Sequence, residues 1–282
     1  MIERPSHMLR RLLVGQVRGV FHDSAKGEKP VKASDLALYP PGSVIRRVHG
    51  DVTSMMIGGV SALLMQMLHP AALAGIWDHS SFRDDMLGRL RRTARFIAVT
   101  TYAERAEAEA AIARVRQVHE HVRGTLADGT AYAASDPWLL AWVHVCEAMS
   151  FLDAWIAYGE PFMSLAEQDR YFAETALVAR ALGADPVPES RAQAVMLMAR
   201  FRDELAVTER TREVARRVLH QPAPSIALAP AQAMMMQASV ALLPGWARRM
   251  HGFSVPVMAW PLVRVGAFAL AGTMRWAFRG KR

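Results

Sequence analysis

An uncharged run at residues 52–77 limits what this chain can fold into, because it contains no Asp, Glu, Lys or Arg. About 20 mainly apolar residues are enough to cross a membrane as a helix, so the run is either a span or part of a folded interior. Its second half holds Gln66, His69 and Pro70, and polar groups in the middle of a membrane are costly. We expect a buried helix, with a span or a monotopic attachment as the alternatives. Since buried polar groups need partners, this segment is also a candidate wall of a binding site.

The pattern of the chain predicts an all-α fold. Gly and Pro separate helical stretches from about residue 50 to about residue 220, no run alternates with the period of a strand, and no internal repeat is present. We expect one multi-helix bundle domain at residues 41–282, preceded at residues 1–40 by a short helix (8–21) and a polar linker. With 52% hydrophobic residues the chain can bury a full core, whereas 21% charged residues argue against a polytopic membrane protein.

The basic charge gives limited information about partners. The net charge is +8, mostly from arginine, and Arg alternates with Glu and Asp along the predicted helices. Because a nucleic-acid binder gathers basic residues on one surface beside aromatic ones, we expect no nucleic-acid partner. The basic residues at 10–18 and at the end of the chain favour a peripheral contact with anionic lipid; the latter are Arg275, Arg279, Lys281 and Arg282.

The cysteine count and the missing motifs exclude several chemistries. A single cysteine, Cys146, allows no disulfide within the chain and no thiolate zinc site. With no secretory signal at the N-terminus, we expect a cytoplasmic protein, with or without membrane association. The sequence has no paired Glu-x-x-His, no zincin motif, no nucleophile elbow, no Walker A loop and no dinucleotide fingerprint. It also has no C-x-x-C-H, so any haem is expected to be held without covalent attachment.

The predicted helix at 106–123 carries two histidines on opposite flanks of its apolar stripe. His119 lies beside Ala108 and Ile112, whereas His121 lies among charged and polar residues, so His119 should face inward and His121 should face water. An inward imidazole can be a satisfied core histidine, or it can ligate iron through one ring nitrogen if the other is held by an acceptor. Sequence geometry leaves both interpretations open.

Two further helices carry candidate residues. The helix at 137–158 begins at Asp136-Pro137, a good cap, and places His144 on a buried face with Glu147 one turn further on. His144 is either a core histidine or a support for a bound group. The helix at 88–102 carries Arg89, with Arg92 or Thr93, beside its apolar stripe; these residues form either a solvated face or a contact with haem propionates or bound oxygen.

These segments together resemble the haem b oxygenases of the latex-clearing-protein and MpaB type. The resembling residues cover roughly 41–220 and are PPGSVIRRVHGD (40–51), GGVSALLMQMLHPAALAGIWDHSSFRDD (58–85), GRLRRT (88–93), VRQVHEHVRG (115–124), DGTAYAASDPWLLAWVH (128–144) and the Gly183-x-x-Pro186 turn. The resemblance implies a globin-like helical core, non-covalent haem b, and dioxygen chemistry on an apolar substrate such as an alkene, an isoprenoid or a lipid-like molecule.

The resemblance also assigns residues. Its proximal haem ligand falls at His119, within Val-His-x-x-Val-Arg-Gly, and Arg123 belongs to the same motif as a cofactor contact. The family's distal Arg-x-x-Lys-Thr falls at Arg89, Arg92 and Thr93, the candidate catalytic residues. Arginine at position 92 is a departure, because a guanidinium stays protonated and cannot coordinate iron as a lysine amine can.

Other positions are less closely matched. The glutamate that the family uses as a base has no clear counterpart, which leaves the polyisoprene reaction in doubt. His69 and His144 are candidates for lining or supporting the haem pocket. Two other classes of function remain open: a non-catalytic helical protein bound to membrane or lipid, and a haem protein without turnover. The sequence identifies neither the substrate nor the oligomeric state.

Overall fold

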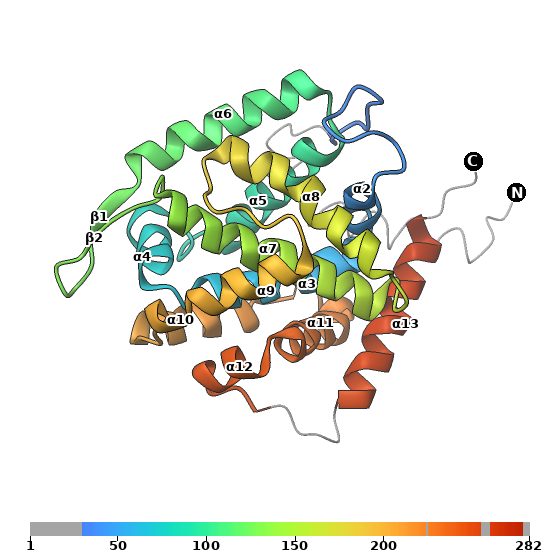
Figure 1. Ribbon diagram of the computed structural model, residues 1–282. Coiled ribbons are helices and arrows are strands. Elements are labelled where there is room, and N and C mark those ends of the chain that lie inside the picture. The colour runs from blue at the N-terminus through green and yellow to red at the C-terminus, as the bar shows by residue number, and fades with distance from the viewer. Residues whose placement is uncertain (1–29, 224, 255–259, 279–282) are drawn as a thin grey trace, which may run out of the picture.

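The computed structural model describes residues 30–223, 225–254 and 260–278, and they form an all-α fold (Figure 1). The helices are α2 (Val44–His49), α3 (Val52–Gln66), α4 (Pro70–His79), α5 (Met86–Tyr102), α6 (Arg105–His121), α7 (Pro137–Tyr158), α8 (Leu165–Leu182), α9 (Arg191–Arg200), α10 (Glu209–Leu219), α11 (Ala229–Leu242), α12 (Gly245–His251) and α13 (Trp260–Phe278). Short 3-10 turns lie at η2 (Arg202–Glu204) and η3 (Ile226–Leu228). The helix predicted at 8–21 lies outside the described residues, and the boundary at residue 40 stays a prediction.

The uncharged run forms two helices instead of one. α3 ends at Gln66, α4 begins at Pro70, and their axes differ by 105°. Pro70 occupies the first turn of α4, where its missing N–H costs nothing, and the His69 ring nitrogen Nδ1 accepts from the Ala71 N–H at 3.2 Å as the cap. The expected burial is confirmed for α3, but the run is not one continuous helix.

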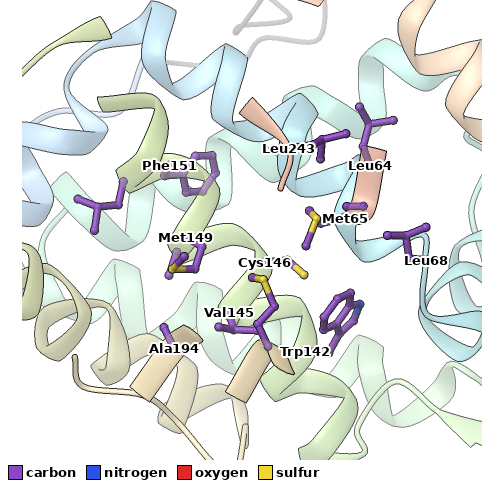
Figure 2. Packing of buried hydrophobic residues seen from close by; sticks show 14 of the residues in the cluster. Leu64, Met65, Leu68, Trp142, Val145, Cys146, Met149, Phe151, Ala194 and Leu243 are labelled. Atoms are coloured by element: carbon purple, nitrogen blue, oxygen red, sulfur yellow. The ribbon is translucent and has the colours of Figure 1, made fainter. Parts of the chain in front are cut away.

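α7 is the central helix, and α3 crosses it closely. A methyl group added at Gly58 of α3 would lie 2.8 Å from the Ser150 carbonyl oxygen of α7, so the crossing depends on the absence of a side chain there. Around the crossing lies the main core, which includes Leu64, Met65, Trp142 and Cys146 (Figure 2). Among the described helices, only α7 is by itself long and apolar enough to cross a membrane, and most of that stretch is buried in the fold.

α5 and α6 form an antiparallel helical hairpin. Only Ala103 and Glu104 separate the two helices, which pack along each other (Figure 1). α2 packs against α5 and α8 packs against α6, whereas neither helix of the hairpin packs closely along α7. This arrangement brings the first turns of α5 to the same end of the hairpin as the last turn of α6.

A small β-hairpin follows α6 and was not predicted. Its strands are β1 (Arg123–Thr125) and β2 (Ala131–Ala133), paired antiparallel with Gly124 opposite Tyr132. Strands of three residues are too short to show a period-2 pattern in sequence. The turn uses Gly129 at φ +89°, a conformation that favours glycine.

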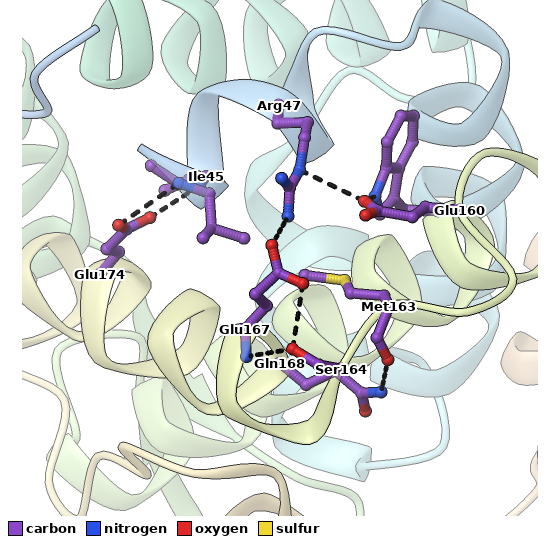
Figure 3. A network of polar contacts seen from close by, with 10 residues as sticks. Ile45, Arg47, Glu160, Met163, Ser164, Glu167, Gln168 and Glu174 are labelled. Atoms are coloured by element: carbon purple, nitrogen blue, oxygen red, sulfur yellow. Dashed lines mark hydrogen bonds and ion pairs between the residues drawn. The ribbon is translucent and has the colours of Figure 1, made fainter. Parts of the chain in front are cut away.

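A polar network attaches α2 to α8 (Figure 3). The carboxylate of Glu174 on α8 accepts from the first backbone N–H groups of α2, at 3.3 Å from Val44 and 2.7 Å from Ile45. Negative charge at a helix N-terminus is stabilising. Arg47 then pairs with Glu160 at 3.2 Å and Glu167 at 2.6 Å, so α2 is held to the end of α7 and the start of α8.

α13 packs on α3, α7 and α11 through small side chains. Val263, Ala267 and Ala271 are its buried residues on this side. Near its end, Arg275 pairs with the Asp51 carboxylate at 3.0 Å and donates to the Tyr158 carbonyl oxygen at 2.8 Å. Arg275 therefore ties α13 both to the cap of α3 and to the last residue of α7.

Candidate functional site

Most of the predicted site residues lie on the α5–α6 hairpin. Arg89, Arg92 and Thr93 lie in the first two turns of α5, and His119 lies in the last turn of α6. α7 carries His144 and Glu147, and the charges of Arg89 and Glu147 influence each other. The Arg89–Glu147 interaction thus links the hairpin with α7 in the candidate site.

His119 is half-buried and His121 is exposed, as their positions on the helix predicted. The Nδ1 atom of His119 is buried and has no hydrogen-bond partner. Burial lowers the pKa of His119, which keeps the imidazole neutral at physiological pH. A neutral imidazole with an unpartnered ring nitrogen is the form that binds a metal.

His144 is a second imidazole of the same kind. Its Nε2 atom is buried without a hydrogen-bond partner. Burial, helped by the positive charge of Arg180, lowers the pKa of His144 to about 4. A buried polar atom without a partner costs stability, and His119 and His144 each carry one such ring nitrogen.

Arg89 supplies the positive charge of the site. Its side chain is half-buried and its Nη1 donates to the Ser80 hydroxyl at 3.1 Å. Burial lowers the pKa of Arg89, the neighbouring charge of Arg92 lowers it further, and Glu147 opposes both. A guanidinium nevertheless stays protonated in proteins, so Arg89 offers a fixed cation to a ligand.

Glu147 is a site residue that the sequence analysis did not assign. Its Oε1 accepts from the Gln66 amide at 3.3 Å, and the same amide nitrogen lies 3.3 Å from the Val143 carbonyl oxygen. Burial raises the pKa of Glu147, while the Gln66 hydrogen bond and the charge of Arg89 lower it. The available signal was a carboxylate one turn after His144 on an otherwise apolar helix.

The remaining arginine and threonine candidates lie at the surface. Arg92 is exposed and its Nη1 lies 3.6 Å from Asp85, while the exposed Thr93 donates to the Arg89 carbonyl oxygen at 3.3 Å. Arg123 is exposed on β1. Arg92 and Thr93 therefore border Arg89 at the rim of the site, and the roles of Arg92, Thr93 and Arg123 stay predictions.

His69 takes part in a different cluster. Its Nε2 lies 3.2 Å from the Glu204 carboxylate, and its ring contacts the rings of Trp142 and Phe201. Burial lowers the pKa of His69, with Glu204 acting in the opposite direction. Both ring nitrogens are engaged and none of these partners is a predicted site residue. Its role in the haem pocket stays a prediction. Within the uncharged run, Gln66 and His69 find partners in the protein, whereas the buried hydroxyl of Ser54 has none.

The donor set of the site suits a metal that brings most of its own ligands. Within the described ranges, no three His, Cys, Asp or Glu side chains gather closely enough to hold a metal ion. A porphyrin-bound iron needs only one axial ligand from the protein. An isolated, neutral, unpartnered imidazole such as that of His119 fits that requirement.

Comparison with known families gives one match. The model of the family described as "ER-bound oxygenase mpaB/B'/Rubber oxygenase, catalytic domain" matches residues 46–277. The chain belongs to this family. It is an oxygenase-family protein, hence an oxidoreductase that acts with oxygen on a small molecule in general terms. The oxygenase domain includes every helix from α3 to α12 and nearly all of α13. No curated protein and no solved structure matches the chain significantly.

Proposed function

We propose that this oxygenase domain uses non-covalent haem b, held through His119, to oxygenate an apolar substrate with dioxygen. The observation that carries the proposal is the buried, unpartnered ring nitrogen of His119 on a neutral imidazole. Membership of an oxygenase family supports the dioxygen chemistry. When bound, haem would supply the redox-active iron, a chemistry that side chains alone do not provide.

The residues of α5 would bind and orient. Arg89 would pair with a haem propionate or steady a polar atom of the bound oxygen or substrate, since it is a half-buried cation beside the site. Arg92 and Thr93 would act at the rim, where Arg92 contributes charge but cannot coordinate iron. Half-buried Leu90, Phe96 and Ile97 on the same helix supply apolar surface for an alkene, an isoprenoid or a lipid-like substrate.

The residues of α7 would support the group and handle protons. The buried Nε2 of His144 would find its hydrogen-bond partner in the bound group or in a water molecule beside it. Glu147 would hold and return a proton at its carboxyl, because burial favours the protonated form and Gln66 fixes the orientation of the carboxyl. This assignment gives the site an acid that does not depend on a match to the family's glutamate.

The test is an absorption spectrum of protein expressed with sufficient haem. We expect a Soret band that His119→Ala abolishes, whereas His121→Ala, an exposed histidine two residues away, retains it. His119→Gly should regain the band when imidazole is added, which a purely structural role would not produce. A parent protein without a Soret band, or equal haem retention in both alanine variants, would show the proposal to be wrong.

The two rival functions separate in further measurements. A haem protein without turnover would show the same spectra but no oxygen uptake with any apolar alkene. A non-catalytic membrane-associated protein would bind lipid without haem. A Soret band in the parent would therefore rule out this function, and its absence would favour it.

We further propose a reducing, cytoplasmic setting, because Cys146 is buried and unpaired.

A further inference from the structure

A hydrogen-bonded row of three side chains runs from α5 through the end of α2 to α8. The Nδ1 atom of His49, the last residue of α2, lies 2.9 Å from the Thr101 hydroxyl of α5, and its Nε2 atom lies 3.1 Å from the Tyr171 hydroxyl of α8. Both hydroxyl-bearing residues are buried, and the His49 ring also makes edge contacts with Phe151 of α7 and with Tyr171. The proposed function uses none of the three side chains in the row, although each is fixed by a neighbour on another helix.

The direction of the hydrogen bonds in this row follows from the chemistry of its members. Burial lowers the pKa of His49 to about 3, so its imidazole is neutral and has one N–H donor and one acceptor nitrogen. The buried Thr101 hydroxyl needs an acceptor for its hydrogen; the Ile97 carbonyl one turn earlier already accepts from the Thr100 hydroxyl at 3.2 Å, whereas His49 Nδ1 lies within reach. Nε2 then carries the ring hydrogen and donates to the Tyr171 oxygen. The Tyr171 hydroxyl therefore keeps its own hydrogen for a further partner.

Glu147 is the carboxyl best suited to be that partner. Burial raises the pKa of Tyr171 well above its ordinary value, so the phenol keeps its hydrogen, and among the neighbouring groups Glu147 of α7 raises this pKa most. Two other carboxylates that act on the phenol are already engaged: Glu174 accepts from the first N–H groups of α2, and Asp153 pairs with Arg191 at 2.6 Å. The remaining neighbour that acts on it, Tyr39, is itself a phenol.

We propose that Tyr171 is a positioning residue of the candidate site, which donates its phenolic hydrogen through one bridging water molecule to the Glu147 carboxyl. A water molecule is the smallest group that can accept from the phenol and donate to the carboxyl. His49 and Thr101 fix the direction of this donation, while Gln66 of α3 holds the same carboxyl at 3.3 Å. Two neutral donors on different helices keep the carboxyl in one orientation as it takes up and returns a proton. The proposal rests on the role proposed for Glu147 and is independent of haem binding by His119.

The first experiment is infrared spectroscopy of the full chain, in which protonated Glu147 is identified as the carbonyl band that Glu147→Gln removes. Tyr171→Phe keeps the ring and removes only the hydroxyl, so we expect the band to shift to higher frequency as the carboxyl loses a hydrogen-bonding partner. The matched control is Tyr39→Phe, which removes the hydroxyl of another buried tyrosine, one without a hydrogen-bond partner, and should leave the band in place. An unshifted band in Tyr171→Phe, equal shifts in both variants, or no band that Glu147→Gln removes would overturn the proposal.

The second experiment measures the direction of the row by nitrogen NMR of the full chain with isotope-labelled histidine, the His49 signals being those that His49→Gln removes. We expect a neutral ring with its hydrogen on Nε2. Thr101→Val removes the donor to Nδ1 and should give a mixture of the two tautomers, whereas Thr100→Val, a neighbouring buried threonine that bonds to its own helix, should not. A parent ring hydrogen on Nδ1 would reverse the row and contradict the proposal. Neither experiment needs haem, so a missing Soret band would count against the proposed cofactor and not against Tyr171.

Discussion

α7 and α13 are both long apolar helices, yet they use their apolar residues in opposite ways. α7 buries its large side chains, such as Trp142 and Phe151, and places the polar groups of His144 and Glu147 at the candidate site. Among the described side chains of α13, Val263 and three alanines are buried, whereas Val265, Phe268 and Trp276 are exposed. Apolar composition alone therefore does not decide which face of a helix is buried.

Loss of the Arg275 side chain should have the largest effect on stability, because it breaks the attachment of α13. Asp51 is almost fully buried, and Arg275→Met would remove both its ion pair with Asp51 and its hydrogen bond to the Tyr158 carbonyl oxygen. We expect the free energy of unfolding to fall by about 3 kcal/mol, measured by urea denaturation.

The matched control is Arg105→Met, which breaks an exposed pair with Glu109 on α6. That change should cost under about 0.5 kcal/mol. Equal losses in the two variants would mean that α13 is not held to the fold by this ion pair.

Replacing glycine by alanine should have opposite effects on stability at the buried α3–α7 crossing and on the exposed face of α13. Gly58→Ala places a methyl group 2.8 Å from the Ser150 carbonyl oxygen of α7 and should destabilise by about 2 kcal/mol through overpacking. Gly272→Ala lies on the exposed face of α13 with nothing within 4 Å and should stabilise by about 0.5–1 kcal/mol, because alanine favours a helix. Thermal unfolding of both variants measures the difference, and effects of the same sign would contradict the comparison.

Lowering the pH should reduce the free energy of unfolding through His144 on α7, by less than the loss expected for Arg275→Met. The folded pKa of His144, about 4, lies below its unfolded value of 6.5, so its contribution is complete above about pH 6.5 and is lost as pH falls toward 4. Unfolding between about pH 7 and about pH 5 should show a loss of up to about 2 kcal/mol from this residue.

His144→Gln should reduce that slope, because an amide does not titrate in this range. His49, whose pKa burial lowers to about 3, is unchanged in this variant, so part of the pH dependence of stability should remain. Gly272→Ala on α13 changes no titratable group and should show the slope of the parent. A slope unchanged by His144→Gln would locate the acid sensitivity elsewhere.

Local patterns predicted the helices well. Asp136 caps α7 by accepting from the Trp138 N–H, as expected, and α5 and α6 begin within two residues of their predicted starts. Caps and prolines are local signals, so they can be found in sequence. The 105° bend after Gln66 could not be predicted from sequence, because its angle is set by the core that surrounds it.

The site was predictable only in part for the same reason. The inward direction of His119 followed from the helical period. The link from Gln66 to Glu147 and Arg89 joins α3, α7 and α5, which are far apart in sequence, and only tertiary packing brings them together. For α13, both faces are apolar, so periodicity gave no indication of which face would be buried.

The short connection between α5 and α6 has a mechanical consequence. With Ala103 and Glu104 alone between the helices, Arg89 and His119 lie at the same end of one tightly connected helical hairpin. Neither helix of the hairpin packs closely along α7, whereas α2 packs on α5 and α8 packs on α6. A substitution that alters those two contacts would therefore shift Arg89 and His119 together relative to Glu147.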